Sequence, residues 1–190
     1  PNKKIFKIEK VRIPLIGIHN IRNSVGALGV ALAVGISVKQ IKKGLLNFKG
    51  VQRRFNKVFT HNNIDFYDDY AHHPTEIRVV LEGVKKVYKN YDKVCIFQPH
   101  RISRLKDLKN EFTFAFKDAD IVILCPIFSA GEKMKLGFNY EKFAKEIIKN
   151  SDVKLLMVEN QFQLAKFIKQ NMYGKKIVIG MGAGSISNWM

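Results

Sequence analysis

The chain has 190 residues, of which 46% are hydrophobic, and this is enough apolar material for one sizeable core with a smaller appendage. No apolar run approaches the roughly 18 to 20 residues of a membrane span, so the sequence predicts no membrane anchor and no membrane partner. The net charge of +17 suggests a nucleic-acid-binding protein. The lysines of the chain, however, are scattered along predicted helices, as on a solvated helix face.

The opening segment, "PNKKIFKIEKVRIP", has neither an apolar signal core nor a small-residue cleavage pattern. It begins with Pro1 rather than Met, so we expect a piece of a longer chain. Cys95 and Cys125 stand far apart within apolar runs, which predicts reduced, buried cysteines rather than a disulfide or a zinc site. Together these features predict a cytoplasmic protein.

The first fifty residues predict a pair of helices. After an extended piece near residues 5–13, Asn20 is expected to cap a helix that runs to about residue 34. Ser37 is expected to cap a second helix over about residues 38–48.

Beyond Gly50 the pattern changes from helices to strands. We therefore expect a boundary there, with residues 1–50 and 51–190 as separate parts. Two β-rich runs within residues 53–70 are separated by the polar triplet "HNN", which predicts a β-hairpin.

Short apolar strands then alternate with amphipathic helices. The predicted helices cover about 74–88, 103–116, 140–148 and 161–170, and the predicted strands 93–97, 121–124, 153–158 and 176–179. This alternation predicts an α/β fold, a Rossmann-like three-layer sandwich with a mainly parallel sheet and right-handed crossovers. Ligands of such sheets bind at the carboxyl ends of the strands, where "DDYAHH" and "QPHRISR" both lie, so we expect one shared site.

The segment "DDYAHHP" could hold a metal ion, cap a helix or contact a ligand. Adjacent histidines in a turn point to opposite sides, so His72 and His73 are not expected to bind one ion, and no metal site is predicted. Asp69 and His72 could instead cap the following helix. Capping does not explain why acids, a tyrosine and histidines all gather at one strand end.

Two further segments carry weaker signals. In "HNIRN", residues 19–23, the asparagine carboxamides could pair with the edge of adenine, although an Asn N-cap is the commoner role. The glycine-rich "GMGAGSIS" that begins at Gly180 lacks the GxGxxG spacing and follows the last strand. It predicts a tight strand-to-helix turn, with a backbone contact to a ligand left open.

Arginine occurs in few places, and this favours local anion recognition. Arg101 and Arg104 are three residues apart, so on a helix they share a face and can grip one anion through planar, two-pronged hydrogen bonding. The alternative is a structural salt bridge to Asp107 or Asp68.

Five segments, taken in order and spacing, resemble the C-terminal portion of the Mur ligases: "GIHNIRNSVGAL", "FKGVQRRF", "DDYAHHPTEI", "FQPHRISR" and "SAGE". The resemblance covers nearly the whole chain, and "HHPTE" with "QPHRISR" is most similar to the members that add L-alanine. It implies that residues 1–50 end the central ATP-binding domain and that residues 51–190 form the C-terminal domain.

The resemblance also implies a reaction and its partners. ATP would phosphorylate the carboxylate of UDP-N-acetylmuramate, and the amine of L-alanine would attack the acyl phosphate in peptidoglycan precursor synthesis. Mg²⁺ and cationic side chains would counter the transferred charge. The phosphate-binding loop and the magnesium ligands of the family are expected outside this chain, so the chain alone is expected to be inactive.

The resemblance assigns residues to both substrates. It implies a nucleotide-binding set formed by His19, Asn20, Asn23, Arg54 and Asp69. It implies an amino-acid pocket lined by Tyr70, His72, His73, Arg101 and Arg104, in which an arginine holds the alanine carboxylate. Arg54 and His73 are the expected catalytic residues.

Two alternative functions stay open at this point. A related Mur-type ligase that adds a preformed peptide to the same nucleotide sugar would share the ATP machinery. A basic nucleic-acid-binding module would instead show an affinity that falls steeply with salt, but the sequence lacks evident aromatic stacking platforms.

Overall fold

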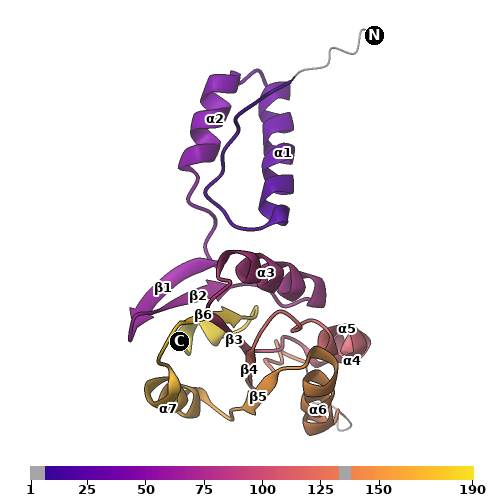
Figure 1. Ribbon diagram of the computed structural model, residues 1–190. Coiled ribbons are helices and arrows are strands. Elements are labelled where there is room, and N and C mark those ends of the chain that lie inside the picture. Colours follow the sequence, from indigo (N-terminus) through magenta and orange to yellow (C-terminus); the bar gives the residue numbers. More distant parts are fainter. Residues whose placement is uncertain (1–6, 133–137) are drawn as a thin grey trace. The chain divides into compact units, whose positions relative to one another are not determined.

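The computed structural model describes residues 7–132 and 138–190, and the chain divides into two compact units, Pro1–Gly50 and Val51–Met190 (Figure 1). The first unit contains helices α1, Ile18–Ala33, and α2, Val38–Asn47. Residues 7–16 of the predicted extended piece form no regular strand, and residues 1–6 lie outside the described part.

The two helices of this unit begin in different ways. α1 starts at Gly17, whose φ of 101° is accessible to glycine at little cost, so the prediction that Asn20 caps the helix is wrong. Asn20 lies inside the first turn, where its side-chain amide donates to Ile16 O at 2.7 Å. Ser37 caps α2 as predicted, in a capping box with Gln40.

The second unit contains a six-stranded sheet. Its strands are β1 Asn56–His61, β2 Ile64–Asp69, β3 Asp92–Phe97, β4 Ile121–Leu124, β5 Lys154–Met157 and β6 Lys176–Met181. The predicted hairpin is confirmed, because β1 pairs antiparallel with β2 across a two-residue turn. Asn62 and Asn63 have φ of 50° and 62° in that turn, and asparagine tolerates this left-handed conformation better than most residues.

The helices of the second unit largely follow the apolar periodicity. They are α3 Pro74–Val87, α4 Ile102–Asp107, α5 Lys109–Thr113, α6 Tyr140–Ser151, α7 Gln161–Asn171 and the short 3₁₀ helix η1 Ile186–Asn188. The single helix predicted over 103–116 is wrong in one respect. Leu108, with φ −111° and ψ 24°, leaves the α-helical range and divides it into α4 and α5.

The strand order is β1-β2-β6-β3-β4-β5, and every pair except β1 with β2 is parallel. The chain moves in one direction across the sheet from β2 through β3 and β4 to β5, and then returns to place β6 between β2 and β3. Right-handed crossovers therefore put α3 to α6 on one face and α7 on the other. This gives the three-layer sandwich that the sequence predicts.

Two apolar clusters hold the layers together. On one face, Leu81 of α3, Phe112 of α5 and Phe143 of α6 belong to one buried cluster against the sheet. On the other face, Leu164 of α7 and Ile186 of η1 belong to the second. Within the described ranges no helix is both long and apolar enough to traverse a lipid bilayer.

The glycine-rich segment after β6 packs tightly against the end of β3. A Cβ atom on Gly182 would lie 2.7 Å from the backbone oxygen of Gln98, and one on Gly184 would lie 2.6 Å from the Phe128 ring. The backbone leads from here into η1, as the strand-to-helix interpretation predicted. The glycines thus allow a close approach between two strand ends.

Replacing Gly182 with alanine should destabilise the second unit. Because the neighbouring atom is backbone and cannot swing away, we expect Gly182→Ala to lower the free energy of unfolding by about 1–3 kcal/mol. Denaturant unfolding of the 190-residue chain, followed through the transition of its second unit, measures this. Gly44→Ala in α2, where nothing lies within 4 Å of the added atom, is the control and should leave that transition unchanged. Equal stability of Gly182→Ala and the parent chain would contradict the packing argument.

Candidate functional site

Three parallel strands of the second unit end side by side, and a polar segment follows each of them. β2 leads into Tyr70, β6 into Gly182 and β3 into Gln98, and β6 pairs with both of the other two strands. The carboxyl ends of parallel strands meet at one edge of a sheet, and this edge is the usual ligand-binding edge of such folds. The two polar segments "DDYAHH" and "QPHRISR" are thus brought together, as the sequence predicted.

Asp69 is the buried acid of this edge. Its side chain accepts hydrogen bonds at 2.8 Å from the backbone N–H groups of Phe55 and Ala71. Asp69 is only 3% exposed, and burial raises the pKa of its carboxyl group from 3.8 to about 6 against the lowering effect of these two bonds. Asp69 therefore braces the chain before β1 and does not cap α3.

The helix cap belongs to His73. Its Nδ1 accepts from the backbone N–H of Thr75 at 3.3 Å, and the His73 N–H donates to the Glu76 carboxylate at 3.2 Å. The alternative that Asp69 and His72 form the cap is therefore wrong. Because Nδ1 of His73 is used as an acceptor, a neutral ring carries its proton on Nε2.

A row of ring contacts crosses the edge from one arginine to another. The guanidinium carbon of Arg54 lies 5.9 Å from the centre of the Tyr70 ring, and Tyr70 meets His72 edge-on at 5.1 Å. His72 meets the ring of His100 at 5.8 Å. His100 Nδ1 in turn lies 3.2 Å from Nη1 of Arg104. The row connects four of the predicted site residues through His100, which sequence reasoning did not select.

Arg101 and Arg104 do not form the salt bridge that was the alternative to ligand binding. Arg104 donates from Nη1 to the backbone oxygen of His100 at 3.1 Å, and Asp68 pairs with Arg53 instead. Within residues 7–132 and 138–190, neither Arg101 nor Arg104 has a carboxylate partner. Burial and the nearby positive charge of Arg104 lower the pKa of His100, which favours the neutral ring.

The segment "SAGE" forms a tight turn that supports the arginine segment. Ala130 and Gly131 have φ of 51° and 85°, and the N–H of Glu132 donates to Ser129 O at 3.0 Å, as in a type I′ turn. Glu132 then accepts from Ser103 N–H at 3.1 Å and from its Oγ at 2.5 Å. These bonds lower the pKa of Glu132 and keep it charged. The sequence offered this segment only as part of a resemblance, without a role.

Arg53 is a second residue of this edge to which no specific role was assigned from the sequence. Its Nη2 donates to Gly182 O at 2.6 Å and its Nε lies 3.3 Å from Oδ2 of Asp68. Its guanidinium carbon is 4.9 Å from the Tyr70 ring centre. Arg54, the predicted residue, is exposed, and its neighbour makes the contacts to the sheet. Adjacent arginines in an irregular segment give no periodic signal to tell them apart.

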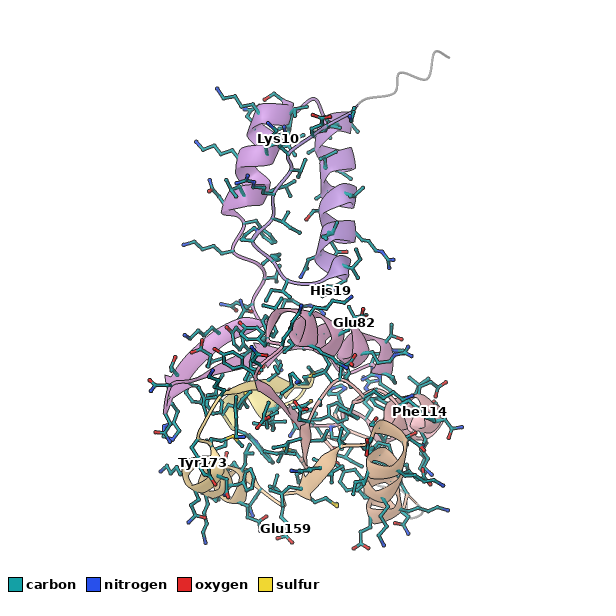
Figure 2. All side chains as sticks on the ribbon, viewed as in Figure 1. Lys10, His19, Glu82, Phe114, Glu159 and Tyr173 are labelled. Carbon is teal, nitrogen blue, oxygen red and sulfur yellow. The ribbon has the colours of Figure 1, made fainter. Side chains whose placement is uncertain are left out.

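The remaining predicted residues lie in the first unit. His19, Asn20 and Asn23 are all on α1, and Figure 2 labels His19 at the start of that helix. Asn20 O accepts from the Ser24 hydroxyl at 2.8 Å, a local helix contact. Their part in nucleotide binding stays a prediction.

No metal centre is evident in the part of the chain that the structure describes. Those residues contain no group of three or more His, Cys, Asp or Glu side chains that could hold a metal ion. His72 and His73 take separate roles, one in the ring row and one at the helix cap.

A family model described as "Mur ligase, glutamate ligase domain" matches residues 53–184, which is most of the chain. The chain belongs to the Mur ligase family.

Several curated Mur ligases are similar to the chain over nearly its full length. It is 68% identical over 190 residues to the UDP-N-acetylmuramate–L-alanine ligase of Pelagibacter ubique, covering 100% of this chain and 41% of that protein. The relative of the same name from Brachyspira hyodysenteriae is 42% identical over 92% of this chain and 37% of its own length. The chain thus spans about two fifths of the length of these relatives.

Solved Mur ligase structures share the fold. The UDP-N-acetylmuramate-alanine ligase MurC of Thermotoga maritima matches with a TM-score of 0.75 and 28% identity, over 93% of this chain and 37% of that one. A murein peptide ligase from Psychrobacter arcticus matches with a TM-score of 0.69 and 22% identity, over 94% of this chain and 37% of that one. The second likeness shows the fold alone. The α/β prediction for this chain is confirmed.

Because the pKa of Asp69 is raised, we expect the free energy of unfolding to depend on pH. A carboxyl group with a pKa of 3.8 when unfolded and about 6 when folded stabilises the fold fully below pH 3.8. This contribution is lost as the pH rises through 6, and it amounts to about 3 kcal/mol, at about 1.4 kcal/mol for each pH unit of difference. We expect the free energy of unfolding of the parent chain to fall relative to that of Asp69→Asn between pH 4 and 7. Parallel pH profiles of the two proteins would contradict the buried, weakly acidic carboxyl group.

Proposed function

We propose that this chain is part of an ATP-dependent ligase that joins L-alanine to UDP-N-acetylmuramate. The carboxylate of the nucleotide sugar would be activated by ATP as an acyl phosphate, and the amine of L-alanine would displace the phosphate. Such a ligase would act in the cytoplasm in peptidoglycan synthesis, and through cell-wall biogenesis it would affect cell shape and division. The names of the two curated relatives support this choice of substrates.

The observation that carries the proposal is the row of rings between two arginines that have no carboxylate partner in the described residues. Arg54 lies at the Tyr70 end of this row and Arg104 at the His100 end. Two separate cationic groups suit a reaction with two anionic centres, a phosphate that is transferred and the carboxylate of an amino acid. Buried or paired arginines would instead indicate a purely structural role.

At the amino-acid end, we assign the alanine carboxylate to Arg101 and Arg104. Their segment is held by three contacts: Arg101 N–H donates to Phe128 O at 2.8 Å, Arg104 bonds His100, and Ser103 bonds Glu132. A guanidinium that is already oriented loses less freedom when it binds an anion. Tyr70 and His72 support this pocket through the ring row.

At the nucleotide end, we assign Arg54 to the ATP phosphates, with Asp69 as its structural support. His19, Asn20 and Asn23 are assigned to ATP, with the asparagines near adenine. His73 is oriented as an N-cap with its proton on Nε2, so it serves as a hydrogen-bond donor to an anionic oxygen rather than as a base. Mg²⁺ belongs to the chemistry of ATP transfer, and we assign its protein ligands to the part of the ligase outside this chain.

Activity can be measured in a hybrid ligase, made from this chain and the part of the Pelagibacter ubique relative that the chain does not cover. We expect Arg104→Lys to raise the KM for L-alanine by about tenfold or more, because a lysine cannot form the two-pronged contact. The KM for ATP should change little. Arg78→Lys, on the exposed surface of α3, is the matched control. An unchanged KM for L-alanine in Arg104→Lys would refute the assignment of the pocket.

The isolated chain should be inactive. The family's phosphate-binding loop does not occur in its sequence. We therefore expect no phosphate release when the 190-residue chain is mixed with ATP, Mg²⁺, UDP-N-acetylmuramate and L-alanine. The hybrid ligase under the same conditions is the positive control. Turnover by the isolated chain would show that it carries a complete active site.

A further inference from the structure

Arg53 makes contacts both around the edge and on the face of its guanidinium group, although it is not one of the residues assigned to a substrate. Nη2 donates to Gly182 O at 2.6 Å and to Gly184 O at 3.4 Å. Nε forms an ion pair with Asp68 at 3.3 Å without an aligned hydrogen bond, and the flat face lies over Tyr70. One side chain thus connects the start of the second unit with the ends of β2 and β6.

Asp68, the acid in this network, is itself held in place. Its side chain is 8% exposed, and both carboxylate oxygens accept from the hydroxyl of Ser187, at 3.0 and 2.9 Å. A buried carboxylate needs such partners, because an unpaired charge in the interior is costly. Arg53 and Ser187 therefore fix Asp68 from two sides, and the segment from Gly182 to η1 is tied to β2.

The backbone on both sides of Arg54 is anchored as well. The carbonyl of Arg53 accepts from Tyr70 N–H at 2.7 Å, and the N–H of Phe55 donates to Asp69 at 2.8 Å. Arg53 and Phe55 have φ of 57° and 53°, a conformation that is costly for residues other than glycine and that persists only when surrounding contacts impose it. Arg54 projects from between two such residues.

We propose that Arg53 is a positioning residue for the ligase reaction, which clamps the strained segment 53–55 to β2 and β6 and thereby aims Arg54. This inference rests on the proposed function of Arg54 at the ATP phosphates. Arg53 acts through its neighbour Arg54, without touching a substrate. The adjacent arginines thus have different roles: Arg53 is held against the protein, and Arg54 binds the ligand.

The clamp requires arginine rather than a positive charge alone. Two carbonyl oxygens and a carboxylate lie around the edge of the planar group, and an aromatic ring lies against its face. A lysine presents one compact ammonium group, which can pair with Asp68 but cannot reach all of these partners together. Arg53→Lys should therefore recover only part of the effect.

The clamp itself can be tested in the 190-residue chain by amide hydrogen exchange. We expect Arg53→Ala to speed exchange about tenfold or more at Tyr70 and Gly182, whose N–H groups bond Arg53 O and Asp69 O, while the amides of β4 keep their protection. Arg53→Ala combined with Asp68→Asn removes the unpaired charge, and it should show the same local effect if the fold is intact. Arg78→Ala is the control. Unchanged exchange at both amides would overturn the clamp, whatever the activity of the ligase.

The positioning role can be tested by a double-mutant cycle in the hybrid ligase. We expect Arg54→Ala to lower kcat/KM by about a hundredfold and Arg53→Ala by about tenfold or more. Because Arg53 acts through Arg54, the double variant should be no more than about twofold worse than Arg54→Ala alone. Arg53→Lys should restore part of the loss, and Arg78→Ala should lose nothing. The KM for L-alanine should stay within about twofold, since the arginines of the other pocket are untouched.

The outcomes separate this inference from the proposed function. Effects of Arg53 and Arg54 that multiply in the double variant would show that Arg53 acts independently, and they would overturn the positioning role. Full activity of Arg54→Ala would overturn the assignment of Arg54 to the phosphates, and the positioning role with it. A hybrid that ligates no L-alanine would refute the proposed function, and the exchange experiment would still decide whether the clamp exists.

Discussion

The site depends on one constraint of chain topology, the return of the last strand to the middle of the sheet. Because β6 lies between β2 and β3 and runs parallel to both, three strand ends meet at one edge. Right-handed crossovers allow this only if α7 lies on the opposite face from α3 to α6, as it does. Segments that are more than a hundred residues apart in sequence, such as Arg53 and Gly182, thereby come into hydrogen-bonding contact.

Electrostatics then decides what this edge can bind. The two acids that end β2 are both buried and both satisfied from within: Asp69 by backbone N–H groups and Asp68 by Arg53 and Ser187. The acid at the far side, Glu132, is held by Ser103. The arginines that face the ring row therefore keep their charge available for a ligand. An edge organised in this way favours anionic groups, which agrees with a ligase that handles phosphates and carboxylates.

The sheet and most helices could be predicted from the sequence, because apolar periodicity and strand length are local signals. Some helix boundaries could not be predicted. α1 starts after Gly17 and not at Asn20, and Leu108 divides a helix that the apolar pattern predicted as continuous. The cluster "DDYAHHP" was correctly placed at a strand end, but its cap is His73 and not Asp69 or His72. No specific role could be assigned from the sequence to Arg53, His100 or Glu132, since their roles arise from tertiary contacts.

The central claim is that this edge of the sheet binds two anionic groups at opposite ends of one row of rings. A crystal structure of the hybrid ligase with L-alanine and a non-hydrolysable ATP analogue tests it most directly. The account predicts the alanine carboxylate within hydrogen-bonding distance of Arg101 or Arg104, and a phosphate oxygen within the same reach of Arg54. Either ligand bound away from the ends of β2, β3 and β6 would contradict it.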